Sequence, residues 1–274
     1  MRLTVLVITA CLNIGQLSQP VSAQDGSPTL VQAQPSQPEP PPAASEGEKE
    51  PPPTPPEAGI HALLRNLGSD FTHLPSKDNA YVALLGGGLA ALAHPADATF
   101  NARLRSHDPL VNNIYKPAKY LGDTPEQVGL SLGTYAYGRI FDAPRVSHLA
   151  MDLLRAQILT EALVEPIKFA TRRQRPDLSD KQSFPSGHAA VTFAAATVIQ
   201  RHLGWRKSLL GYTIASYVAS SRLHDNRHYL SDVVFGAAVG TIAGRTVTQH
   251  GRDMWTVAPV RVPGGVAILA SRTR

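Results

Sequence analysis

Residues 183–203 read SFPSGHAAVTFAAATVIQRHL, where a break rich in proline, serine and glycine runs directly into an apolar, alanine-rich segment. The pattern predicts a helix that begins at Gly187, with Ser186 as its N-cap. Backbone N–H groups at the start of a helix have no acceptor within it, so those of Gly187 and His188 form a ready anion site. Glycine also lets a ligand approach the backbone closely. An ordinary capped helix with a surface histidine is the plainer interpretation of this stretch alone.

Five further apolar segments of helical length accompany this one, at residues 79–94, 125–141, 146–173, 206–223 and 229–247. Short polar or Gly/Pro breaks separate them, as between packed helices. Only residues 254–272 differ, because they read as strand, turn and strand around the letters PGG. The sequence therefore predicts an all-α helical bundle with a small C-terminal β-hairpin.

The apolar cores of these helices are short for a membrane span. Their charge-free runs reach roughly 12 to 15 residues, against the roughly 20 that a spanning helix needs. Charged residues interrupt them at Arg201, Lys207, Arg222 and Arg245. A glycine stripe at residues 236, 240 and 244 permits close helix contact either in lipid or in a soluble core. These features favour a soluble bundle and leave membrane embedding as the alternative.

The chain opens with the features of an export signal. Arg2 precedes an apolar run, and VSA before Gln24 matches a small-residue cleavage site. We therefore expect residues 1–23 to be a signal peptide and the protein to be exported to a bacterial periplasm. The letters ITAC, ending at Cys11, resemble a lipoprotein box and leave a lipid anchor as an alternative. Cys11 is the only cysteine, so cleavage would leave no disulfide and no thiol chemistry.

Residues 24–58 form a different region, with 11 of the 23 prolines and almost no bulky apolar side chains. This composition cannot bury enough surface to fold and predicts a disordered, extended linker. The helical domain is expected at residues 59–250, and the hairpin and tail at residues 251–274.

The linker and the helical domain carry net charges of opposite sign. The linker carries −5 and Arg2 carries +1, so the total of +5 leaves +9 on residues 59–274. A basic domain suggests an anionic partner, such as a phosphate ester or an acidic lipid surface. The sequence has neither zinc-finger spacing nor basic repeats interleaved with aromatic residues, which argues against nucleic acid.

A second block, KFATRRQRP, precedes the opening stretch. Lys168 and Arg175 stand seven residues apart, two helical turns, and can project from one face. Pro176 biases Arg175 out of the helix, which would aim its guanidinium away from the helix wall. A solvated basic helix end is the plainer interpretation.

A third block, SRLHDNRHYLSD, occupies residues 221–232. His228 and Asp232 stand four apart, so on a helix they would lie one above the other. A carboxylate beside an imidazole fixes the histidine tautomer for chemistry. Arg222 can bind an oxyanion through two parallel hydrogen bonds.

The same block admits a metal interpretation, because His224 and His228 have the spacing of zinc-binding helices. Three cationic side chains at one centre would repel a metal ion, so we expect no metal there. His224, Asp225 and Arg227 are interpreted as surface residues, with Arg227 also a candidate for the substrate entrance.

Together the three blocks resemble the signature of the type-2 phosphatidic acid phosphatase superfamily, which also includes bacterial acid phosphatases and vanadium haloperoxidases. The pattern K-x6-R-P, P-S-G-H and S-R-x5-H-x3-D is complete here, and the resemblance covers residues from about 80 to 248. It implies a helical bundle of the phosphatase/haloperoxidase type and a phosphatase that needs neither metal nor cofactor. The proline-rich segment and the terminal hairpin are not part of the resemblance.

The resemblance also implies a role for each motif residue. His228 would be the nucleophile that forms a phosphohistidine, Asp232 the group that orients it, and His188 the general acid. The implied phosphate-binding residues are Lys168, Arg175, Ser186, Gly187 and Arg222.

The substrate stays open, because soluble phosphomonoesters, phosphatidate, prenyl pyrophosphates and lipid A phosphates share the phosphoryl group that the signature binds. Three alternatives accompany the phosphatase prediction: a vanadium-dependent haloperoxidase, a non-catalytic phosphate- or lipid-binding protein, and the same phosphatase embedded in a membrane. The expected partners are a phosphorylated small molecule or a lipid phosphate, together with a membrane surface rather than nucleic acid.

Overall fold

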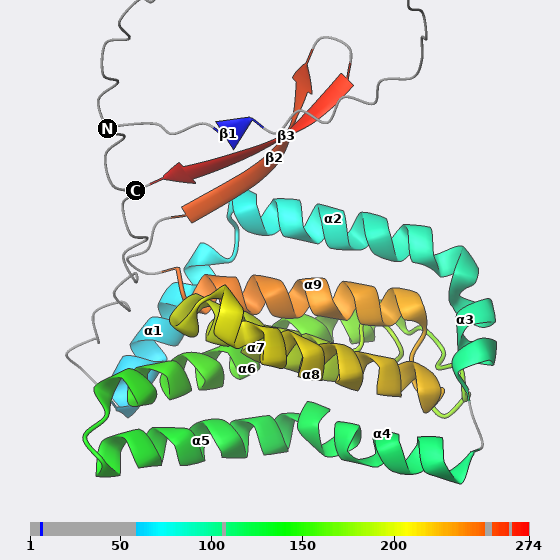
Figure 1. Ribbon diagram of the computed structural model, residues 1–274, viewed down its shortest axis with the longest axis horizontal. Helices are drawn as coiled ribbons and strands as arrows, with labels where there is room; N and C mark the ends of the chain where they lie inside the picture. Colours follow the sequence, from blue (N-terminus) through cyan, green and yellow to red (C-terminus); the bar gives the residue numbers. More distant parts are fainter. Residues whose placement is uncertain (1–5, 8–58, 106–107, 250–253, 263–264, 274) are drawn as a thin grey trace, which may run out of the picture.

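The computed structural model describes residues 6–7, 59–105, 108–249, 254–262 and 265–273 (Figure 1). The predicted linker and most of the predicted signal peptide lie outside these residues. The helices are α1 (Ile60–His73), α2 (Lys77–Ala93), α3 (Asp97–Leu104), α4 (Pro109–Gly122), α5 (Thr124–Ile140), α6 (Pro144–Thr171), α7 (Gly187–Leu203), α8 (Trp205–His224) and α9 (Leu230–Val247), with a 3-10 turn η1 (His94–Ala96). The strands are β1 (Leu6–Val7), β2 (Met254–Val262) and β3 (Gly265–Thr273).

The predicted helical bundle is confirmed. The six segments expected to be helical correspond to α2 and α5 to α9, and their ends agree within two residues. The opening stretch forms α7 from Gly187 to Leu203, and the Ser186 side chain accepts from the backbone N–H of Ala189 as the N-cap. Helices α1, α3 and α4 were not among the six predicted segments.

Helix α7 lies in the middle of the bundle and packs against α6, α8 and α9 (Figure 1). On the far side of α9 lies α2, and α5 covers α6. The glycine stripe of α9 faces α7 so closely that a Cβ atom at Gly240 would lie 2.0 Å from the carbonyl oxygen of Ala190. A Cβ atom at Gly236 would lie 2.5 Å from the carbonyl oxygen of Ser186. Close helix contact is therefore what these glycines allow.

Small aliphatic side chains fill the core, which matches the alanine-rich sequence. One fully buried cluster joins three helices, α6, α7 and α9, through Ala156, Leu159, Ala194, Val198, Ala243 and Val247. Short side chains bring helix axes close and leave little room for adjustment. The start of α7 and the turn before α9 are thereby held in fixed positions at one end of the bundle.

The C-terminal segment forms the predicted hairpin. Strands β2 and β3 pair antiparallel, from Met254 opposite Thr273 to Val262 opposite Gly265. Strand β1 adds to the other edge of β3, giving the order β1–β3–β2. This pairing involves Leu6 and Val7, which cleavage after Ala23 would remove.

The outer faces of the bundle carry many exposed apolar side chains. They gather on α2, α5 and the first turns of α8, and include Leu84, Leu85, Leu92, Leu130, Ile140 and Leu210. Among the described helices, α9 has the length and composition to cross a membrane, although 61% of it is buried within the bundle. Monomeric soluble proteins rarely expose apolar surface on this scale. The outer surface fits the membrane-embedded alternative better than a freely soluble bundle.

Candidate active site

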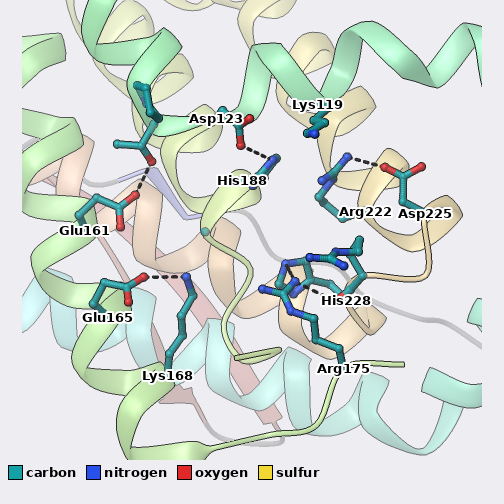
Figure 2. A pocket seen from close by; sticks show the side chains of 14 residues that line it. Lys119, Asp123, Glu161, Glu165, Lys168, Arg175, His188, Arg222, Asp225 and His228 are labelled. Atoms are coloured by element: carbon teal, nitrogen blue, oxygen red, sulfur yellow. Dashed lines mark hydrogen bonds and ion pairs between the residues drawn. The ribbon is translucent and has the colours of Figure 1, made fainter. Parts of the chain in front are cut away.

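The three sequence blocks meet at one end of the bundle, around a cavity of about 600 Å³ (Figure 2). The end of α6, the loop after it, the start of α7, the end of α8 and the turn before α9 all contribute to its wall. Six of the eight predicted site residues line it: Lys168, Arg175, Gly187, His188, Arg222 and His228. The other two, Ser186 and Asp232, are fully buried beside it, and the Ser186 N–H donates to the Asp232 carbonyl at 3.0 Å.

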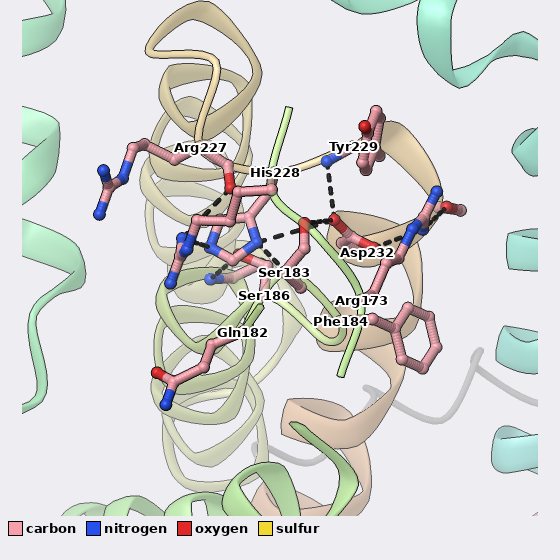
Figure 3. Close-up of polar contacts among 12 residues, drawn as sticks. Arg173, Gln182, Ser183, Phe184, Ser186, Arg227, His228, Tyr229 and Asp232 are labelled. Carbon is pink, nitrogen blue, oxygen red and sulfur yellow. Dashed lines mark hydrogen bonds and ion pairs between the residues drawn. The ribbon is translucent and has the colours of Figure 1, made fainter. Parts of the chain in front are cut away.

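The neighbours of His228 fix its tautomer (Figure 3). Its Nδ1 lies 2.6 Å from the backbone carbonyl of Ser183, which can only accept, so Nδ1 carries the proton. Its Nε2 lies 3.1 Å from Nη1 of Arg175, which can only donate, so Nε2 presents a lone pair. Burial lowers the pKa of His228, which keeps the imidazole neutral. The result is a neutral ring with its basic nitrogen facing the cavity.

Asp232 lies within ion-pair distance of His228, as the spacing of four residues predicted, but its closer hydrogen bonds are to other groups. Helix α9 begins at Leu230, so His228 lies in the turn before it and the pair does not share a helix. The Oδ2 atom of Asp232 lies 3.8 Å from Nδ1 of His228 and instead accepts from the Tyr229 N–H at 2.8 Å and the Ser183 hydroxyl at 2.5 Å. The expected hydrogen bond from Nδ1 is made to the Ser183 carbonyl. Asp232 therefore orients His228 indirectly, by tying together the two segments that hold the ring.

Arg173 is a site residue that the sequence did not single out. Its guanidinium donates to Asp232 Oδ1 at 2.6 Å, to Ser231 Oγ at 2.7 Å and to Asp97 Oδ2 at 2.7 Å. It also lies 4.3 Å from the centroid of the Tyr229 ring. Arg173 thus neutralises the buried carboxylate of Asp232 beside His228. The only signal was its membership of TRRQRP, where nothing distinguishes it from its neighbours.

His188 projects into the cavity from the first turn of α7. Burial and the positive charge of Arg222, with smaller effects of His228 and Lys168, lower the pKa of His188 to about 3. Its Nε2 lies 2.8 Å from Oδ1 of Asp123 (Figure 2), but at an angle outside hydrogen-bond geometry. Asp123, at the junction of α4 and α5, was not predicted because no motif covers that part of the chain. Its carboxylate is placed to stabilise a protonated His188.

Each of the three predicted phosphate-binding cations is held by a carboxylate. The pairs and their N–O distances are Lys168–Glu165 at 2.7 Å, Arg175–Asp180 at 2.7 Å and Arg222–Asp225 at 2.5 Å. The cationic side chains are 6 to 13% exposed, whereas their acidic partners are 37 to 54% exposed. The carboxylates can therefore turn towards solvent when a stronger anion enters, while the cations stay in the wall.

The interpretation of His224 as a surface residue is wrong. Its side chain is buried, Nε2 lies 2.8 Å from Oδ1 of Asn112, and the ring stacks on Tyr115 at 4.6 Å. A buried amphipathic ring at the end of a helix cannot be told from an exposed one by sequence spacing. Arg227, by contrast, lines the cavity, and its side chain is 41% exposed, as expected for an entrance residue.

His224 and His228, whose spacing suggested a metal site, do not point towards one common position. His224 bonds Asn112 on α4, whereas His228 bonds Ser183 and Arg175, so the two rings hold different partners. In the described residues, the group of His, Asp, Glu or Cys side chains with metal-ligand spacing lies elsewhere, at His148, Asp152 and His202.

Comparisons with known proteins agree with this geometry. Residues 149–254, which contain all three sequence blocks, match the family model of the PAP2 superfamily. Over 89 residues the chain is 44% identical to the lipid A 1-phosphatase of Porphyromonas gingivalis, a match that covers 31% of this chain and 20% of that protein. Over 102 residues it is 35% identical to the decaprenylphosphoryl-5-phosphoribose phosphatase of Mycobacterium tuberculosis, covering 34% and 56% of the two chains.

A solved structure shares the fold. The crystal structure of the transmembrane PAP2 type phosphatidylglycerolphosphate phosphatase from Bacillus subtilis aligns with a TM-score of 0.51 and 21% identity, over 64% of this chain and 96% of that one. The chain spans between a fifth and just over half of the length of the two curated relatives named above. The chain is thus similar to the PAP2 superfamily over residues 149–254, about two fifths of its length.

Proposed function

We propose that the chain is a phosphatase that hydrolyses phosphate esters or pyrophosphates of lipids through a phosphohistidine, without a metal ion. The observation that carries the proposal is the neutral His228, whose Nε2 lone pair faces a cavity walled by Lys168, Arg175 and Arg222. Phosphoryl transfer needs mainly positioning and charge stabilisation. Three fixed cations supply both to the phosphoryl oxygens, with the Ser186 hydroxyl and the Gly187 N–H as further donors.

In the first step, the Arg175 guanidinium turns from His228 Nε2 to the phosphoryl oxygens. The freed Nε2 lone pair forms a bond to phosphorus while the bond from phosphorus to the ester oxygen breaks. The Nδ1 proton stays hydrogen-bonded to the Ser183 carbonyl, which stabilises the positive charge that develops on the ring. His188, which is neutral in the empty cavity and takes up a proton when the anionic substrate binds, gives that proton to the leaving oxygen, so that the product departs as an alcohol.

In the second step, a water molecule attacks the phosphohistidine. His188, now neutral, takes the proton from the water, and the bond from phosphorus to Nε2 breaks. Inorganic phosphate leaves, His188 releases its proton as the anion departs, and both histidines return to their starting states. The carboxylate of Asp123 supports the protonated form of His188 that each cycle requires.

Lipid phosphates are the substrate class that the surroundings favour. Exposed apolar side chains follow cavity residues directly in the sequence: Tyr120 and Leu121 follow Lys119, and Phe169 follows Lys168. The relatives are named for lipid A and for decaprenylphosphoryl-5-phosphoribose. The apolar outer faces of α2 and α5 would contact acyl chains, and the predicted export signal would place the cavity on the periplasmic side.

Phosphate release by the purified chain in EDTA tests the activity. The panel comprises p-nitrophenyl phosphate, phosphatidate, undecaprenyl pyrophosphate, a lipid A phosphate and nucleotides. We expect release from the lipid substrates, loss of release in His228→Ala, and unchanged release in His61→Ala, which removes an exposed histidine of α1. A 32P-labelled intermediate should be trapped in wild type only.

Two results would contradict the proposal. A labelled intermediate in His228→Ala would show that another residue is the nucleophile. Vanadate-dependent halogenation of monochlorodimedone, in place of phosphate release, would identify a haloperoxidase instead.

A further inference from the structure

A second cluster of ionisable side chains lies at the opposite end of the bundle. His148 and Asp152 stand on the first turns of α6, and His202 stands on the last turn of α7. Lys168 of the phosphate cavity lies 20 residues further along α6, which corresponds to about 30 Å of helix. The proposed phosphatase chemistry therefore makes no use of this cluster.

The three side chains share one point in space. Oδ2 of Asp152 lies 2.8 Å from Nε2 of His202 and 3.6 Å from Nε2 of His148. All three atoms lie within 4.8 Å of one another, and the two imidazole rings are 5.0 Å apart with their planes at 70°. Ligand atoms about 2.0 to 2.1 Å from a tetrahedral zinc ion are separated by about 3.3 Å. The observed separations of 2.8 and 3.6 Å between ligand atoms lie on either side of this distance.

The carboxylate of Asp152 is held as a ligand would be. Its Oδ1 accepts from Nη1 of Arg155 at 2.7 Å, which leaves Oδ2 directed at the histidines. Arg155 is itself fixed on Asp70 of α1 and donates to the Val247 carbonyl of α9. Hydrogen-bonded support of this kind orients the ligands of metal sites.

The cluster is shielded from solvent. Asp70, Asp152 and Arg155 are almost fully buried, and Arg155 pairs with both carboxylates. The His148 and His202 side chains are 15% and 6% exposed, so solvent screens the cluster weakly.

We propose that His148, Asp152 and His202 form a binding site for a divalent transition metal, with zinc as the ion that two imidazoles and one carboxylate suit best. A water molecule would complete the tetrahedron. The ion would tie α6 to the end of α7 and, through Arg155, to α1 and α9. Its role is to stabilise the bundle, at a place remote from the phosphate cavity.

Zinc binding by the full-length chain tests this site. The protein is stripped with EDTA, dialysed, and titrated with Zn²⁺ in competition with a chromophoric chelator; Co²⁺ is added separately to record the absorption bands of a tetrahedral complex. We expect one ion per chain, a higher melting temperature with zinc, and at least about 100-fold weaker binding in His202→Ala. His148→Gln, at a less buried position, should weaken binding in the same direction and keeps the test valid if His202→Ala does not fold.

Matched variants separate this site from the phosphate cavity. The double variant His188→Asn/His228→Asn removes both cavity histidines and should keep zinc affinity within about twofold of wild type, whether or not the proposed phosphatase activity exists. The proposal is overturned if wild type binds zinc no more tightly than His148→Gln, or if zinc leaves the melting temperature unchanged. A histidine pKa raised by Asp152, seen by NMR in the zinc-free and zinc-treated protein alike, would then show that a proton balances the buried charge.

Discussion

Two contacts of opposite character decide the chemistry of His228. A carbonyl oxygen at Nδ1 and a guanidinium at Nε2 leave one tautomer, and burial keeps it neutral. The carboxylate of Asp232 acts one step further away, through Ser183 and Tyr229, and Arg173 balances its charge. Residues outside the cavity wall, Ser183, Asp232 and Arg173, therefore help to set the tautomer and position of His228.

Arg173→Met tests this indirect control. Because Arg173 does not line the cavity, we expect kcat to fall by at least about tenfold while KM stays within about twofold. Arg172→Met is the matched control, since Arg172 is exposed and stacks on Phe169. Steady-state kinetics of the two variants, with 15N NMR of the His228 ring, provide the measurement. Equal kcat values for both variants, or an unchanged tautomer, would refute the positioning role.

Asp123→Asn tests whether Asp123 supports His188 in its proposed role as general acid. A weaker His188 acid should slow esters with poor leaving groups, such as alkyl phosphates, by about tenfold or more. Release from p-nitrophenyl phosphate, whose leaving group needs little protonation, should change much less. Glu126→Gln, which removes an exposed carboxylate three residues away, serves as the control. Equal losses on both substrates would count against a role in proton transfer.

Anion binding should couple to protonation of His188. The pKa of about 3 arises from burial and from Arg222 and other cavity cations, and a bound dianion offsets that positive charge. Binding therefore raises the pKa towards its ordinary value, so protons are taken up, and uptake declines as pH rises above the pKa of the complex. Calorimetric titration with tungstate in buffers of different ionisation enthalpy measures the uptake, which His188→Asn should abolish. Uptake of equal size in that variant would assign the proton to another group.

At the scale of the elements, the contact between α7 and α9 determines where the site lies. Gly236 packs on the Ser186 carbonyl and Gly240 on the Ala190 carbonyl, so the two helix backbones touch directly. The start of α7 and the turn before α9 carry His188 and His228. Their separation depends on this contact.

Gly240→Ala should destabilise the bundle by about 1 to 3 kcal/mol, because the new methyl group meets a backbone carbonyl that cannot rotate away. Gly88→Ala in α2 is the control: its Cβ atom would meet nothing within 4 Å. There alanine should be neutral or stabilise by up to about 1 kcal/mol, through its higher helix propensity. Chemical unfolding followed by circular dichroism compares the two. Similar stability of the variants would show that α9 does not press on α7 in solution.

At the scale of the whole molecule, the outer surface bears on where the protein works. Exposed leucines lie on α2 and α5, and charged side chains line the cavity. Helices α2 and α5 lie on opposite sides of the bundle (Figure 1). Such an arrangement suits a bundle whose flanks contact lipid and whose cavity opens to water.

We therefore expect the full-length protein in the membrane pellet rather than in the osmotic-shock supernatant, and resistance to extraction by alkaline carbonate. Detergent should release it with activity intact. A periplasmic marker enzyme and a known inner-membrane protein provide the two reference fractions. Recovery in the shock supernatant would instead support the prediction of a soluble bundle, which was based on the short apolar runs.

The sequence by itself determined the helical class and a set of residues that line one cavity. Alanine-rich segments bounded by Gly/Pro breaks predict helices because local periodicity is written in neighbouring residues. The three blocks identified Lys168, Arg175, His188, Arg222 and His228 as one set, and all five line the cavity.

Only the tertiary structure decided how those residues are held. The Ser183 carbonyl rather than Asp232 receives the Nδ1 proton of His228, and Arg173 and Asp123 join the site from positions with no motif. His224 is buried against α4, although it lies between cavity residues in the sequence. These contacts join segments as far as 112 residues apart, as for His224 and Asn112. Local spacing carries no record of such pairings, because helix packing alone brings the partners together.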